Sequence, residues 1–114
     1  MKTVSERNGL EFTAKFFDHE NQPAVPATVH WRLDCQTTGA NLVDWTEETP
    51  VATYDDFGDA VDVSVEVEIP ASANAIQQDS NRREIKELTV TAGKDTDREY
   101  SETITYVVVN RKRP

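Results

Sequence analysis

The chain has 114 residues, a formal net charge of −9 and 37% hydrophobic residues. Its length is typical of a single domain, and its negative charge disfavours a nucleic-acid-binding surface. The single cysteine excludes an internal disulfide. The first residues lack the apolar core of a signal peptide, and no apolar run approaches the roughly 18 residues of a membrane span. We therefore expect a protein made in the cytoplasm, with neither nucleic acid nor membrane as a partner.

Alternation of apolar and polar side chains, the pattern of half-buried strands, runs through most of the chain. In chain order, the predicted strands cover residues 10–17, 27–36, 42–48, 60–69, 83–93 and 100–110, with 51–54 as a shorter candidate. Turns rich in Gly, Pro, Asn and Asp separate them. Short polar turns between successive strands favour antiparallel pairing.

The clearest strand is "AVDVSVEVEIP", residues 60–70, in which valines alternate with acidic residues. Its apolar side chains are expected to face a core, and Asp62, Glu66 and Glu68 to face outward. Pro70 cannot donate a hydrogen bond to a neighbouring strand and is expected to end it. Residues 70–78 are the one helix-like segment, with Ile76 expected to pack down onto the sheet.

These elements predict an all-β fold, specifically an immunoglobulin-like antiparallel β-sandwich of about seven strands with one short helix. The sandwich is expected over residues 9–109, with Trp31 central in its core. Residues 1–8 are expected to form a flexible N-terminal arm and residues 110–114 a basic C-terminal tail. A small barrel is the main alternative architecture.

No pattern in the sequence predicts catalysis. His19, His30 and Cys35 are placed in a loop or on opposite strand faces, whereas zinc needs three or four converging ligands. Residues 55–59, "DDFGD", lack the ligand spacing of a calcium-binding EF-hand loop and are expected to be an acidic turn. We find no nucleophile beside a base and no glycine-rich phosphate loop, so we expect no enzyme activity, no metal and no cofactor.

Two charged groups are candidates for binding a partner. The basic tail contains Arg111, Lys112 and Arg113, which contrast with an acidic body and are suited to an acidic neighbour, with a frayed, solvated chain end as the alternative. The outward acids Asp62, Glu66 and Glu68 keep sandwiches from stacking while free and are also suited to a basic patch. Trp45 is interpreted as a core residue, with a semi-exposed interface anchor as the alternative.

The order of several short motifs resembles that of a group of small virion proteins of tailed bacteriophages. The resemblance covers residues 25–110 and is carried by "VHWRLDCQTTGANLVDWTEETP", "IPASANAI", "NRREIKELTV" and "YVVVN". The acidic insert "YDDFGDA" departs from the pattern of the group, which leaves any contact of that loop in doubt.

The resemblance implies a non-enzymatic, immunoglobulin-like structural protein of the virion. We expect a cement or decoration subunit that binds the major capsid protein or other virion proteins and self-associates on the particle. A head–tail connector or tail component is the first alternative, and a carbohydrate- or cell-surface-binding module is the second. The last would require an exposed aromatic platform.

Overall fold

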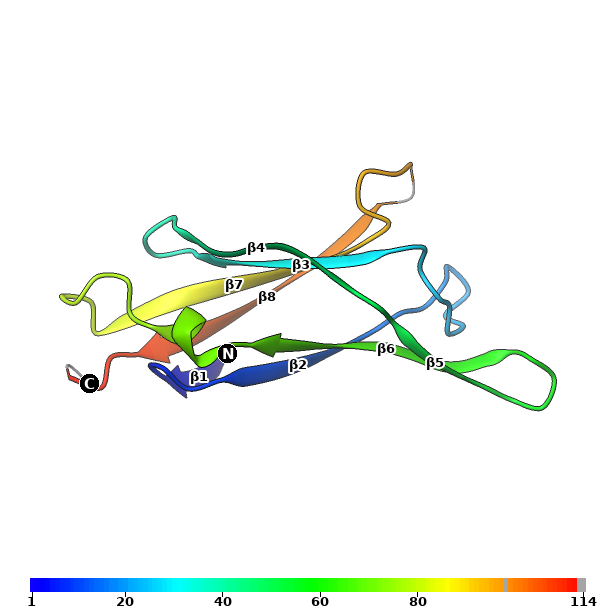
Figure 1. Cartoon of the computed structure of the whole chain (residues 1–114), viewed down its shortest axis with the longest axis horizontal. Helices are drawn as coiled ribbons and strands as arrows, with labels where there is room; N and C mark the ends of the chain where they lie inside the picture. The colour runs from blue at the N-terminus through cyan, green and yellow to red at the C-terminus, as the bar shows by residue number, and fades with distance from the viewer. Residues whose placement is uncertain (98, 113–114) are drawn as a thin grey trace.

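The computed structural model describes residues 1–97 and 99–112, which form eight strands and one short 3₁₀ helix (Figure 1). The elements in chain order are β1 (Lys2–Ser5), β2 (Leu10–Lys15), β3 (Val29–Cys35), β4 (Asn41–Glu48), β5 (Val51–Tyr54), β6 (Ala60–Ile69), η1 (Ala71–Asn74), β7 (Arg83–Ala92) and β8 (Tyr100–Val109).

The strands form two sheets, one of five strands in the order β1-β8-β7-β3-β4 and one of three in the order β2-β6-β5. All neighbours pair antiparallel except β1 and β8, which run parallel. The predicted all-β sandwich is confirmed, with one strand more than expected. The finer immunoglobulin-like assignment stays a prediction.

The core lies between the two sheets and follows the alternation of the sequence. β3 buries Val29, Trp31, Leu33 and Cys35, and β6 buries its odd-numbered residues from Val63 to Ile69. Each fully buried side chain of this size stabilises the fold by about 1.5–3 kcal/mol. Trp31 is 4% exposed, as expected for a central core residue, and its indole nitrogen donates to Glu48 Oε1 at 3.1 Å.

The loop between β6 and β7 begins at Pro70, where the strand ends as predicted. The predicted helix over residues 70–78 is shorter than expected, because only Ala71–Asn74 are helical. Ile76 packs against the core cluster, as predicted. The loop therefore lies on the sandwich and contributes side chains to its interior.

Residues Lys2–Ser5, which the sequence places in a flexible arm, form strand β1 instead. They pair with Tyr106–Val109 of β8, and the Val4 side chain is 9% exposed within the core cluster. The amide of Glu6 continues the contact by donating to the carbonyl of Val109 at 2.9 Å. β1 thus covers the edge of β8, which would otherwise have unpaired backbone groups.

This pairing predicts slow backbone hydrogen exchange near the N-terminus. Peptides covering residues 1–8 should exchange more slowly than peptides covering the exposed turn 55–59, because amides bonded within the sheet exchange only when the sheet opens, whereas the hydrogen bonds of an exposed turn open locally. Hydrogen–deuterium exchange with mass spectrometry measures this difference. Complete exchange of residues 1–8 at the earliest time point would support a flexible arm instead.

Candidate functional site

Two charged side chains, Glu84 and Lys86, are fully buried on the inner face of β7. They continue the alternation that places Leu88 and Val90 in the core. Because every second side chain of a strand faces the same side, both point inward. Ile85, between them, faces the opposite side. Sequence reasoning missed this pair, although extending the alternation back from Leu88 would have found it.

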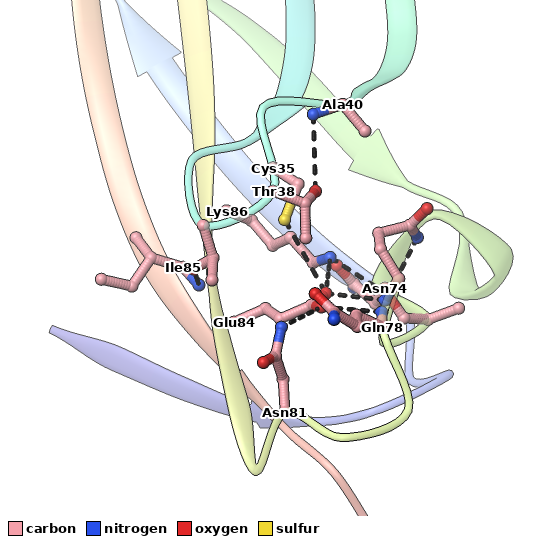
Figure 2. A network of polar contacts seen from close by, with 12 residues as sticks. Cys35, Thr38, Ala40, Asn74, Gln78, Asn81, Glu84, Ile85 and Lys86 are labelled. Atoms are coloured by element: carbon pink, nitrogen blue, oxygen red, sulfur yellow. Dashed lines mark hydrogen bonds and ion pairs between the residues drawn. The ribbon is translucent and has the colours of Figure 1, made fainter.

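The Glu84 carboxylate is surrounded by hydrogen-bond donors (Figure 2). Lys86 Nζ lies 3.0 Å from Oε1, and the backbone amide of Gln77 lies 2.7 Å from the same oxygen. The amide of Gln78 and the side-chain amide of Asn81 each donate to Oε2 at 3.0 Å. A buried charge is tolerated only when it is paired and hydrogen-bonded in this way.

Burial alone would raise the pKa of Glu84, because it disfavours the charged form. The hydrogen bonds from Gln77, Asn81, Lys86 and Gln78 outweigh burial and lower the pKa to about 2. Glu84 is therefore a carboxylate at neutral pH. Lys86 Nζ makes its second hydrogen bond to the carbonyl of Ala75, at 3.1 Å.

A neighbouring polar contact joins the same loop to β8. The Tyr106 hydroxyl donates to Asn74 Oδ1 at 2.5 Å, and Asn74 Nδ2 donates to the carbonyl of Asn8 at 2.6 Å. Tyr106 and Asn74 are both fully buried. Burial raises the pKa of Tyr106, so its hydroxyl stays protonated and remains a donor.

This buried polar cluster holds the fold together. Its donors and acceptors are directed at one another and at backbone groups of the loop and the β1–β2 turn. Cys35 belongs to it as a buried thiol, 3.7 Å from Glu84 Oε1. Since fully buried side chains cannot reach a substrate, we assign the cluster to fastening residues 70–82 onto the sandwich.

The predicted acidic face lies on the outside of the three-stranded sheet. Asp62 forms an exposed ion pair with Lys15 at 2.8 Å, whereas Glu66 and Glu68 are exposed opposite β2. A side-chain hydrogen bond with Glu66, together with its negative charge, raises the pKa of Glu11. The structure thus brings Glu66 and Glu68 beside Glu11, whereas Asp62 forms its ion pair with Lys15.

The predicted basic tail lies among further basic side chains from other segments. Five exposed cations form what we call the basic end, and they are Arg7, Arg82, Arg83, Arg111 and Lys112. The Asn110 amide donates to the carbonyl of Arg82, and Arg83 is paired with Val109, which joins these segments. Arg111 also donates to Asn8 Oδ1 at 2.8 Å. Arg113 lies outside the described residues.

Asn110, assigned by the sequence to the tail, is a structural residue. It is 3% exposed, and its side chain donates to the carbonyls of Asp79 and Asn81 at 3.2 and 2.9 Å. The basic end therefore begins after a fixed residue, and its position relative to the sheet is set by hydrogen bonds.

Trp45, for which a core position was favoured, lies outside the core cluster and is half-buried. The Arg32 guanidinium lies 5.5 Å from the centre of its ring, and the Lys94 ammonium lies 5.1 Å from it. Both contacts are cation–π interactions. A ring held by two cations is a poor platform for stacking a sugar.

Neither a metal-binding group of side chains nor a membrane-spanning helix is found among the described residues. Within residues 1–97 and 99–112, no group of three or more His, Cys, Asp and Glu side chains could hold a metal ion. No described helix is long and apolar enough to cross a membrane. Residues 55–59 form an acidic turn, as predicted, in which Asp55 accepts hydrogen bonds from the amides of Phe57 and Asp59.

Replacing Glu84 tests the buried pair. Glu84→Gln should lower the free energy of unfolding by on the order of 3–5 kcal/mol, because Lys86 is left buried without its counter-charge. Urea denaturation at neutral pH measures the change. The exposed pair provides a matched control, since Asp62→Asn should cost no more than about 1 kcal/mol. Equal effects of the two substitutions would contradict the assigned role.

Glu84 also predicts a pH dependence. Its pKa is lower in the folded protein, so its contribution to stability is present above its ordinary value near 4.5. That contribution of about 3 kcal/mol should be lost as the pH falls from 5 to 2. The difference in unfolding free energy between the wild type and Glu84→Gln should shrink over this range. A constant difference would show that Glu84 titrates normally when folded.

Comparisons with protein-family models, with curated proteins and with solved structures give no match to this chain.

Proposed function

We propose that this protein is a non-enzymatic structural subunit that works through protein–protein contacts. The observation that carries the proposal is the separation of exposed charge on a fixed scaffold. The basic end lies near the C-terminus, and the acidic turn 55–59 lies at the opposite end of the long axis (Figure 1). The molecule measures 55 × 28 × 20 Å, so these surfaces are far apart.

The buried polar cluster supports this proposal, because its most perturbed groups are sealed inside the protein. A catalytic site usually exposes such groups in a cleft. Here Glu84 and Tyr106 are inaccessible, and the exposed charges lie on surfaces suited to protein contacts. Complementary charge of this kind guides the encounter and orientation of two proteins.

The strand order supports an immunoglobulin-like fold. In immunoglobulin domains one sheet contains strands B, E and D, and the other contains G, F and C, with C′ added in variable-type domains. Taking β2 as B gives B-E-D for β2-β6-β5 and G-F-C-C′ for β8-β7-β3-β4. Strand β1 lies beside β8 in the second sheet.

We place the protein on the virion of a tailed bacteriophage, as a cement or decoration subunit on the capsid surface. This placement rests on the motif order across residues 25–110. Repeated weak contacts over a symmetric shell give high avidity from a small protein. A connector or tail ring remains the alternative position, and it differs in copy number because a ring contains few subunits.

The basic end should strengthen binding to the particle. Arg82→Glu/Lys112→Glu should reduce occupancy on purified particles, most strongly at low salt, because screening weakens exposed charge contacts. Lys2→Glu is a control with an exposed cation on β1 that is not one of the five residues of the basic end. Asn110 is left unchanged in these variants, because its side chain is hydrogen-bonded to the loop between β6 and β7.

Quantitative gels of purified particles measure occupancy and copy number together. Many copies per shell support decoration, and a count matching one ring supports the connector alternative. Absence of the protein from particles would overturn the proposed function. Occupancy unchanged by the double substitution would reject the role of the basic end.

A further inference from the structure

The β5–β6 hairpin extends beyond the rest of the sandwich (Figure 1). β2 pairs with β6 only from Ser64 to Ile69, whereas Ala60, Asp62 and Val63 of β6 pair with β5 alone. The radius of gyration is 16.2 Å, compared with roughly 13 Å for a compact domain of this length. The hairpin contributes to this elongation and carries its turn away from the core.

The turn of this hairpin, residues 55–59, is held by local hydrogen bonds, and we call it the acidic tip. Asp55 Oδ1 accepts hydrogen bonds from the backbone amides of Phe57, at 2.9 Å, and Asp59, at 3.0 Å. The Asp55 amide donates to the carbonyl of Asp59 at 2.9 Å. Gly58 supplies the left-handed conformation that the turn needs, with φ of +84°. The tip is therefore shaped before any partner binds.

Phe57 is presented on this tip with 91% of its surface exposed. Tyr54 and Val61, on the two strands that lead to the tip, are 59% and 53% exposed. Aromatic side chains that are held in place and become buried on binding are typical interface anchors. An apolar ring on a preformed turn thus points to a protein contact.

The charge around Phe57 defines the surface that it fits. Residues 51–62 contain four aspartates and no Lys or Arg. Asp62 is paired with Lys15, which leaves Asp55, Asp56 and Asp59 around the tip. The occupant of the tip must therefore combine apolar surface with several cations.

The opposite end of the same molecule combines apolar surface with several cations. Three half-buried side chains, Ile85, Val107 and Val109, lie on the outward face of β7 and β8 and form what we call the apolar patch. Ile85 is paired with Val107, and Figure 2 shows Ile85 directed away from the buried polar cluster. Arg83 is paired with Val109, so the patch adjoins the basic end.

We propose that the acidic tip of one copy docks on the basic end of a second copy, with Phe57 against the apolar patch. Asp56 and Asp59 then face Arg82 and Arg83. One copy cannot make this contact with itself, because the two surfaces lie at opposite ends of a molecule 55 Å long. The contact joins different surfaces of two copies, so it repeats head to tail and produces a ring or a chain.

Sedimentation equilibrium of the purified protein tests this contact without any particle. Wild-type protein should self-associate with increasing concentration at low salt and dissociate at high salt. Phe57→Ser should weaken the association constant by about tenfold or more. The tip-reversed variant Asp56→Arg/Asp59→Arg and the end-reversed variant Arg82→Asp/Arg83→Asp should each lose self-association. Asp55 is kept in every variant because it shapes the turn.

Mixing the two reversed variants is the decisive measurement, because the basic tip of the first then meets the acidic end of the second, and the unchanged acidic tip of the second meets the unchanged basic end of the first. Association should return in the mixture. Glu66→Arg/Glu68→Arg makes the same charge change as the tip-reversed variant, but on the outer sheet face, and should associate like the wild type. Circular dichroism and thermal unfolding check that each variant is folded.

A wild-type protein that stays monomeric at low salt would overturn the inference, as would a mixture that fails to associate. These results leave the proposed function intact if the protein still occupies purified particles. Conversely, self-association by a protein absent from particles would support the head-to-tail contact and reject the virion role.

Discussion

The hydrogen-bonded ion pair between Glu84 and Lys86 is the interaction on which the rest of the structure depends. It lies where the β6–β7 loop, β7 and the core meet, and its partners include backbone groups of the loop. Removing two charges from water is costly, so the pair is stable only with its full set of donors and acceptors. That requirement fixes the path of residues 70–82 and supports the neighbouring position of Asn110.

The positions of the residues in the basic end are set by the buried ion pair and by the loop that it fastens. Arg82 is the last residue of the loop and Arg83 is the first residue of β7, while Arg111 and Lys112 follow Asn110, which is hydrogen-bonded to the same loop. The opposite end is organised differently, because the acidic tip is held by the Asp55 side chain without support from the core. The molecule therefore has one end shaped by long-range contacts and another shaped by a local turn.

Much of the fold was predictable because alternation in strands such as β3 and β6 is unambiguous. Strand β1 was not predicted, since four residues give little periodicity and its pairing with β8 spans almost the whole chain. Glu84 and Lys86 were missed because charged residues suggest an outward face. They nevertheless alternate in step with Leu88 and Val90, and therefore lie on the same, inward face of β7. Of the predicted partner-binding residues, Arg111 and Lys112 are exposed together, but their neighbours Arg7, Arg82 and Arg83 could be recognised only after folding.

The parallel pairing of β1 with β8 also has a consequence for synthesis. Among the described strands, β1 is synthesised first and its partner β8 is synthesised last, and β7 needs β8 on its free side. Val4 and the edge of β7 therefore stay unprotected until residues 100–109 emerge. The five-stranded sheet is therefore completed only when β8 has been synthesised, after all of its other strands, which favours a single closing step.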